Sequence, residues 1–197
     1  SMKETNFDFA TDLIMRRRSI YPSSFKDELV DDEMVLQLLN NANQAPSHRH
    51  TEPWRFHVIR TEAKDRFAVF MQDCYKQMFT GDSFNIMKLN KISKKIAKSS
   101  HIIMISMMRD KNDSVPEWEE LAATACAVQN LYLSVTAAEL GGYWSTPDYF
   151  INEAKAFFEM EEGERCLGLF YLGVPMDELP PRMEKKPIED KTRWYRD

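Results

Sequence analysis

The chain has 197 residues, 43% of them hydrophobic and 12% aromatic, which is enough for a single domain with a sizeable core. Its 26 Lys and Arg against 31 Asp and Glu give a net charge of −5, so nothing global favours nucleic acid or an anionic membrane as a partner. Three widely spaced cysteines fit neither a disulfide framework nor a zinc ribbon, and they favour a reduced, cytoplasmic protein.

The first two predicted elements are helices. The first ends at the basic run of residues 16–19, since Pro22 follows shortly afterwards. Cations near a helix C-terminus stabilise its dipole by about 0.3–1 kcal/mol each, so this run needs no ligand to explain it. Asp31 or Asp32 can accept the free amide hydrogens of the second helix, whose apolar stripe ends before Pro46.

The middle of the chain predicts strands and polar helices. Residues 54–60 alternate between apolar and polar side chains, as a strand does. Residues 63–98 predict two polar helices broken near residues 80–83, and residues 101–108 form a continuous apolar run of strand length.

A long Ala-rich helix of low charge is predicted over residues 117–140, and this composition indicates that it is buried. We expect Trp118 to pack in the core at the head of its apolar stripe and Cys126 to lie on its buried face. The pair Gly141-Gly142 is expected to end the helix, because glycine accepts the left-handed cap geometry. A short strand over residues 143–146 follows.

The last predicted elements are a helix at about residues 150–160 and a strand over residues 166–174. From residue 175 the chain is rich in Pro and charged residues and has little to bury alone, so this tail must lie on another surface. The order of elements predicts one α+β domain with an extended C-terminal arm over about residues 175–197.

The loop of residues 45–54 carries an unusual set of polar side chains between two prolines. His48, His50 and Glu52 are two residues apart, so an extended segment could offer zinc two imidazoles and a carboxylate, as in a metal hydrolase. Pro46 and Pro53 instead favour an irregular loop, and no fourth ligand is indicated. The spacing alone leaves a metal site, a binding loop and a surface loop without a role as alternatives.

Several short motifs occur in a distinctive order along the chain. They are Arg17-Arg18-Ser19, Ala45-Pro46-Ser47 followed by Glu52-Pro53-Trp54, a Gly-Gly turn after a long helix, and Lys185-Lys186-Pro187. In this order and at these separations the chain resembles the nitroreductase family of FMN enzymes, in its compact bacterial branch. The resemblance implies an α+β nitroreductase-like fold, with a central mixed β-sheet flanked by helices.

The resemblance also implies a site for the FMN phosphate and ribityl chain. Arg17 and Ser19, with Arg18 beside them, match the family's phosphate motif at its start. Lys185 or Lys186 would reach the same phosphate from the tail. A guanidinium group matches two phosphate oxygens, which explains why arginine suits this position.

Two further segments would hold the flavin ring by the same resemblance. One borders the isoalloxazine and contains Pro46, Ser47 and His48. The other runs along the flavin edge near its reactive nitrogen and contains Trp144, Ser145 and Thr146. Many relatives have Lys or Arg where this chain has Tyr21, so the cation expected near the flavin is missing there, and His48, Arg49 or His50 are candidates to replace it.

The activity implied is ping-pong hydride transfer from NADH or NADPH through FMN to a nitroaromatic, quinone or similar acceptor, in a homodimer whose two sites use both chains. No side chain needs to act as a nucleophile, so no catalytic residue is assigned. The loop sequence His50-Thr51-Glu52-Pro53-Trp54 also resembles the dehalogenating branch of the family, which leaves a reductive dehalogenase as an alternative. A flavin-binding protein without turnover is a second alternative.

Overall fold

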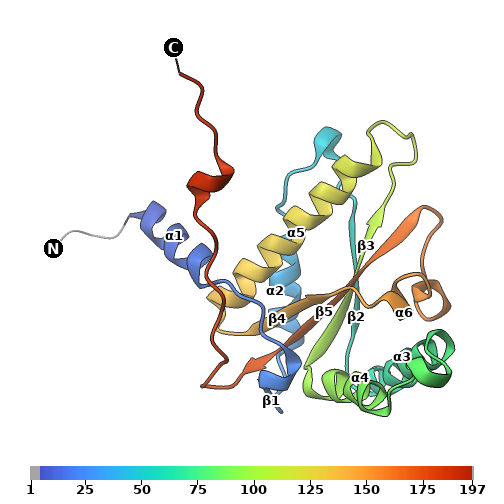
Figure 1. Cartoon of the computed structure of the whole chain (residues 1–197). Helices are drawn as coiled ribbons and strands as arrows, with labels where there is room; N and C mark the ends of the chain where they lie inside the picture. The colour runs from blue at the N-terminus through green and yellow to red at the C-terminus, as the bar shows by residue number, and fades with distance from the viewer. Residues whose placement is uncertain (1–4, 197) are drawn as a thin grey trace.

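The computed structural model describes residues 5–196, which form a sheet with helices on both faces and two extended ends (Figure 1). The strands are β1 (Phe25–Lys26), β2 (Trp54–Ile59), β3 (His101–Met108), β4 (Gly141–Ser145) and β5 (Glu164–Pro175). The α-helices are α1 (Asn6–Arg16), α2 (Asp32–Ala42), α3 (Glu62–Met78), α4 (Ile86–Lys98), α5 (Glu117–Ala137) and α6 (Asp148–Ile151). Short 3-10 helices are η1 (Pro22–Ser24), η2 (His48–His50), η3 (Gly81–Ser83), η4 (Ala154–Ala156) and η5 (Ile188–Lys191).

The sheet has the order β1-β5-β3-β2, and β4 also pairs with β5. Each of its four pairings in the described chain is antiparallel, so it lacks the parallel pair that a mixed sheet would contain. Strand β3 is buried at every position, because both of its faces are covered by helices. Its bounds are those predicted from the apolar run.

Two cores lie on opposite faces of the sheet, and β3 contributes to both in alternation. Ile102 and Met104 face a core that includes residues of α3, α4 and α6. Ile103 and Ile105 face the other core, which includes residues of α2 and α5. The alternation follows from the two-residue period of a strand. The two polar helices predicted over residues 63–98 are confirmed as α3 and α4, separated by η3.

Helix α1 and the C-terminal tail lie beside each other, away from the body of the domain (Figure 1). Arg182 donates hydrogen bonds to the carbonyl oxygens of Met15 (2.8 Å) and Arg16 (3.3 Å), and Arg18 donates one to the carbonyl of Pro180 (2.7 Å). Helix α1 has no buried residue, and the tail from residue 180 to residue 196 is exposed throughout. The tail therefore touches its own chain mainly at its start.

Four predictions about local structure are wrong. Glu139, with φ of 58°, supplies the left-handed residue after α5, while Gly141 and Gly142 lie inside β4. These glycines serve close packing, because a Cβ on Gly141 would meet the Phe25 ring at 2.7 Å and one on Gly142 would meet the Phe170 ring at 2.2 Å. The helix expected over residues 150–160 is broken into α6 and η4.

The third error concerns α5, whose outer face is not covered by the described chain. Trp118 is 67% exposed and Cys126 is exposed, although both were expected to be buried. The fourth error concerns the cap of α2. This helix begins after Asp31 as predicted, but the Asp31 side chain makes no capping hydrogen bond, and the Asp32 side chain binds His101 and Arg60. Within residues 5–196, no helix combines the length and apolar character that crossing a lipid bilayer requires.

Candidate functional site

The basic run after α1 meets the C-terminal half of α5 and the end of β4 through one buried tyrosine. The Arg17 guanidinium carbon lies 5.0 Å from the centre of the Tyr132 ring. The Tyr132 hydroxyl lies 3.2 Å from Ser19 Oγ and accepts a hydrogen bond of 2.8 Å from the backbone N–H of Trp144. Tyr132, which was not among the predicted site residues, thus joins two of the predicted segments, residues 17–19 and residues 144–146.

This cluster has the donors that an anion needs. Arg17 is half-buried, and within residues 5–196 its guanidinium makes neither an ion pair nor a side-chain hydrogen bond. Because the Tyr132 oxygen already accepts from Trp144, its own proton can be donated to Ser19, which leaves the Ser19 proton free for a ligand. A half-buried cation without a carboxylate partner suits a bound phosphate.

Arg18 lies on the other side of the chain from this cluster. It donates to the Pro180 carbonyl, and its Nε atom is buried without a partner in the described chain. Arg18 therefore ties the start of the tail to the end of α1. Lys185 and Lys186 lie further along the exposed tail, and neither side chain makes a hydrogen bond or ion pair with the rest of the described chain.

The segment of Trp144, Ser145 and Thr146 packs against a glycine in β5. Trp144 Nε1 donates to the Leu167 carbonyl at 2.9 Å. Gly168 has φ of 118°, and a Cβ there would lie 2.4 Å from the Ser145 carbonyl oxygen and 3.0 Å from Trp144 Nε1. Gly168 is thus needed both for its backbone conformation and for the close approach of this segment. Apart from the residue type, nothing in the neighbouring sequence indicates this role of Gly168.

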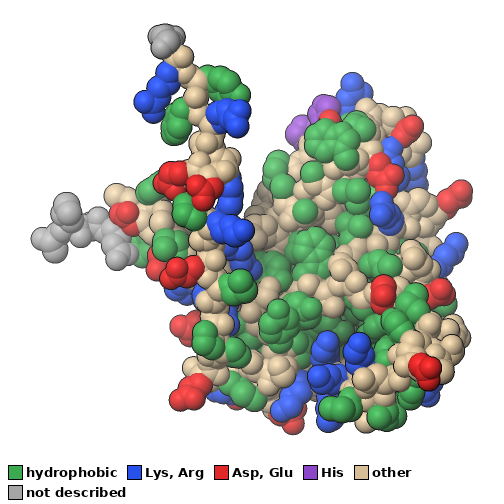
Figure 2. Space-filling model, in the orientation of Figure 1, with side chains coloured by type: hydrophobic (Ala, Val, Ile, Leu, Met, Phe, Trp, Pro, Cys, Tyr) green, Lys and Arg blue, Asp and Glu red, His purple; other side chains and the backbone are tan. Residues whose placement is uncertain are grey.

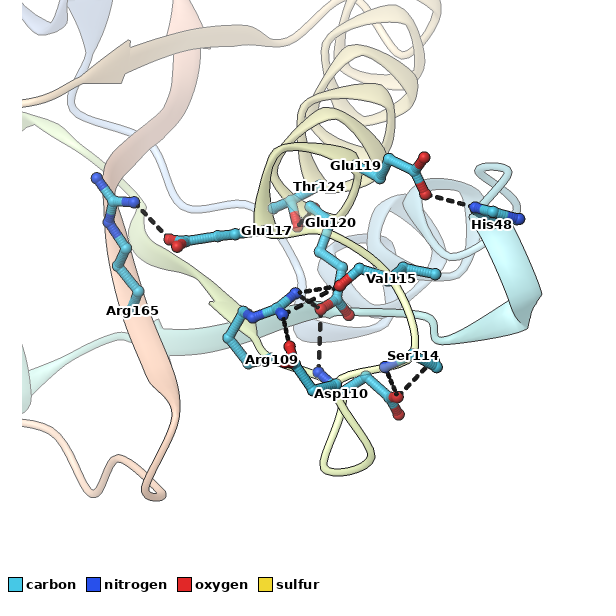
Figure 3. Close-up of polar contacts among 11 residues, drawn as sticks. His48, Arg109, Asp110, Ser114, Val115, Glu117, Glu119, Glu120, Thr124 and Arg165 are labelled. Carbon is cyan, nitrogen blue, oxygen red and sulfur yellow. Dashed lines mark hydrogen bonds and ion pairs between the residues drawn. The ribbon is translucent and has the colours of Figure 1, made fainter.

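The loop with Pro46, Ser47 and His48 lies at the N-terminal end of α5. His48 Nδ1 pairs with a carboxylate oxygen of Glu119, as Figure 3 shows. Ser47 Oγ accepts a hydrogen bond of 3.2 Å from the Glu52 backbone N–H, and Pro46 is exposed. Glu119 and Tyr132 are 13 residues apart on one helix, which corresponds to about 20 Å. The predicted site residues of one chain therefore fall into two groups.

This loop also stores backbone strain. Arg49, His50 and Glu52 have φ values of 57°, 55° and 44°, which residues with a side chain rarely adopt. Each such residue costs on the order of 1–3 kcal/mol and persists where the surrounding structure requires it. Strain of this kind is common in loops that hold ligands.

The start of α5 is acidic and held by arginines. Glu117, Glu119 and Glu120 lie in its first turn, where negative charge stabilises the helix dipole. Arg109 pairs with the buried Glu120, and Arg165 pairs with Glu117 at 2.7 Å (Figure 3). His48 therefore faces the one acid of this turn that has no arginine partner in the described chain.

The structure offers no metal centre among residues 5–196, since no three His, Cys, Asp or Glu side chains are placed to share an ion. A hydrogen-bonded chain of Ser100, His101 and Asp32 does exist, with distances of 2.8 and 2.9 Å. Ser100 is buried, and its oxygen already accepts from the Val30 N–H at 2.7 Å. The hydrogen bond from His101 lowers the pKa of Asp32. The hydrogen-bonded series of Ser100, His101 and Asp32 is therefore a structural link between α2 and β3.

Comparison with known proteins gives consistent results. The sequence profile of the nitroreductase family matches residues 14–174. A Bacillus subtilis protein provisionally named an NAD(P)H nitroreductase is 28% identical over 186 residues, covering 91% of each chain. A nitroreductase-like family protein from Bacillus cereus superposes with a TM-score of 0.78 at 24% identity, covering 99% of this chain and 98% of the other. The FMN-dependent nitroreductase of Mycobacterium smegmatis, solved in complex with NADPH, gives 0.76 at 17% identity, covering 97% and 100%. The chain therefore belongs to the nitroreductase family, and its fold is the nitroreductase-like fold predicted from the sequence.

Proposed function

We propose that this protein is an NAD(P)H-dependent oxidoreductase that binds FMN and acts as a homodimer. When bound, FMN accepts a hydride from the nicotinamide and passes electrons to an electron-poor acceptor such as a nitroaromatic or a quinone, in a ping-pong sequence. The observation that carries the proposal is the half-buried Arg17, which pairs with no carboxylate among residues 5–196 and lies on the Tyr132 ring beside Ser19. Family membership supports the activity class.

Arg17 and Ser19 are proposed to bind the phosphate end of the cofactor. The guanidinium can offer two parallel N–H groups to phosphate oxygens, and the Ser19 hydroxyl can add a third donor. Tyr132 holds both residues in place, and its link to the Trp144 backbone positions the segment proposed to run along the flavin edge. Orientation of the cofactor is then the main task of this group.

Pro46, Ser47 and His48 are proposed to complete the site from a second copy of the chain. One chain places them about 20 Å along α5 from the Arg17 group. A two-fold axis crossing α5 midway would exchange its ends, because a symmetric interface brings residue i of one copy to residue j of the other. The His48 end of one copy would then meet the Arg17 end of its partner.

The described chain leaves the surfaces for such a dimer uncovered. Helix α5 carries an exposed stripe of mostly apolar residues at helical spacing: Trp118, Ala122, Ala125, Cys126 and Gln129. Helix α1 exposes Phe7 (77%) and Met15 (68%), and the tail exposes Trp194 (75%). Apolar surfaces of this extent mark interaction sites. The tail, with Lys185 and Lys186, is proposed to lie on the partner.

The cofactor assignment is tested by FMN binding to two arginine variants. Arg17→Ala removes the unpaired cation, while Arg16→Ala removes a neighbouring arginine that pairs with Asp12 at 2.8 Å. A charge-assisted hydrogen bond is worth about 1.5–3 kcal/mol, so Arg17→Ala should weaken FMN binding by about 10-fold to 100-fold. Arg16→Ala should bind FMN as the wild type does. Equal FMN affinities for the two variants would refute the phosphate assignment.

The reaction is tested on the purified protein under anaerobic conditions. Flavin absorbance at about 450 nm should disappear when NADPH or NADH is added and return when an acceptor is added. Absorbance that does not respond to either donor would support a flavin-binding protein without turnover. Turnover with halogenated acceptors but not with nitro or quinone acceptors would support the dehalogenase alternative.

A further inference from the structure

A hollow lies between α4 and residues 21–27, the segment that follows Arg17 and Ser19. Its volume is about 760 Å³, and it is lined on one side by Tyr21 and Ser23. Lys91, Lys94, Lys95 and Lys98 of α4 line the other side. Figure 2 shows Lys and Arg side chains gathered at the lower edge of the molecule, where Figure 1 places α4.

The position of these lysines follows from the pattern of α4. Leu89, Ile92 and Ile96 form its buried face, so the lysines at positions 91, 94, 95 and 98 share the opposite side. Lysines near the end of a helix stabilise its dipole, which accounts for Lys95 and Lys98 but not for the two further from the end. Like charges four residues apart destabilise a helix, so helix stability does not explain the cluster.

The cations of this hollow are not neutralised by the described chain. Within residues 5–196, none of the four lysines makes an ion pair with a carboxylate, and Asp27 is the only acid among the lining residues described. Burial, together with the nearby charge of Lys91, lowers the pKa of Lys95. A hollow with four cations and one anion on its walls is suited to a ligand with more than one negative charge.

The hollow adjoins the proposed flavin site. Tyr21 is two residues after Ser19, and its ring meets the ring of Tyr143 with centroids 4.6 Å apart. Tyr143 directly precedes Trp144 in β4. The Tyr21 side chain is 54% exposed, so its ring can also stack on a planar group. A ligand in this hollow can therefore extend toward the flavin.

We propose that this hollow binds the phosphorylated adenosine half of the electron donor and that the α4 lysines make the enzyme prefer NADPH over NADH. The inference rests on the proposed function. NADPH differs from NADH by a phosphate on the ribose 2′ position, and lysine binds phosphate as a mobile point charge. Tyr21 offers a face for the adenine ring, and the four lysines line the opposite wall of the hollow.

The kinetic test uses the FMN-loaded enzyme and two double variants with the same change of charge. Lys91→Gln/Lys95→Gln removes two lysines of the hollow, while Lys76→Gln/Lys88→Gln removes two exposed lysines outside its lining. The wild type should have the higher kcat/KM for NADPH. The first variant should lose about tenfold in kcat/KM for NADPH through KM, with a smaller loss for NADH. The second should keep the wild-type values.

A binding measurement separates this inference from the proposed function. Adenosine 2′,5′-bisphosphate and AMP are titrated calorimetrically into the protein with and without FMN. The bisphosphate should bind more tightly than AMP, less tightly to Lys91→Gln/Lys95→Gln, and less tightly as salt is added. If the protein binds no flavin but still shows this pattern, the proposed function fails and the phosphate site stands.

Two results would overturn the inference. One is an equal loss of kcat/KM for both donors with unchanged binding of the bisphosphate. The other is a loss that depends on the charge of the acceptor and not on the donor, which would assign the lysines to the acceptor instead.

Discussion

The Tyr132 hydroxyl provides the sharpest test of the site, because it joins two segments of that site, Ser19 and Trp144. Tyr132→Phe keeps the ring under Arg17 but removes the group that contacts Ser19 Oγ and accepts from the Trp144 N–H. A half-buried N–H left without a partner costs about 1–2 kcal/mol. For a chain of this size each kcal/mol corresponds to about 2–4 °C in Tm, so Tm should fall by about 2–8 °C. FMN affinity should fall as well.

A matched control separates stability from binding. The hydroxyl of the buried Tyr75 also accepts a backbone hydrogen bond, from Asn85 at 3.1 Å, but lies away from the proposed site. Tyr75→Phe should lower Tm by a similar amount and leave FMN affinity unchanged. Thermal unfolding by circular dichroism and FMN titration by fluorescence measure both quantities. Wild-type Tm and FMN affinity in Tyr132→Phe would refute the role of this hydroxyl.

Three further predictions address the packing, the pH dependence and the dimer. Gly168→Ala should lower the free energy of unfolding by about 3 kcal/mol or more, because the left-handed backbone and the Ser145 carbonyl oxygen at 2.4 Å both oppose a Cβ. A Cβ on Gly81 would meet nothing within 4 Å, so the control Gly81→Ala should cost about 1–2 kcal/mol for its left-handed backbone alone. Denaturant titrations measure both values. Burial opposes ionisation of Glu164, but hydrogen bonds from Ser106 and His57 outweigh it and lower the pKa of this carboxyl below 4.5. The stability that ionised Glu164 contributes is therefore present above about pH 4.5 and is lost as the pH falls through the lowered pKa. Glu164→Gln should flatten the decline of Tm at acid pH. A dependence of Tm on pH like that of the wild type would contradict this. Cys126 lies midway between Glu119 and Tyr132 on α5, so the two copies of this thiol should face each other at the proposed axis. A small oxidant should then link the two copies through a Cys126–Cys126 disulfide, since the other two cysteines are buried. A monomer band as strong as that of Cys126→Ser would argue against the proposed axis.

The elements that the sequence predicted well are those whose signal is local. Strand β3 shows this best, because eight consecutive buried positions leave an unbroken apolar run. The end of α1 at the basic run and the break between α3 and α4 at η3 also follow from nearby residues. The order of the family motifs along the chain predicted the fold, which the comparisons confirm.

The errors arose where distant residues decide the outcome. The ring of Phe25 and the ring of Phe170 occupy the space beside Gly141 and Gly142, so these glycines are required in a strand and not in a helix cap. The helical spacing of apolar residues placed Trp118 on an apolar stripe of α5. This spacing does not indicate whether the stripe is covered by the same chain or by another one. Tyr132 looked like any interior aromatic residue of a helix, because its partners come from segments 113 and 12 residues away.

The length of α5 is itself part of the proposed site. The loop that carries His48 is attached near the beginning of this helix, and Ser19 is attached three to four turns later. Inserting one extra turn would move these attachment points apart by about 5.4 Å in each copy and pull the two halves of every site out of alignment. We therefore expect relatives to tolerate insertions in surface loops while keeping the number of residues between the positions of Glu119 and Tyr132 constant.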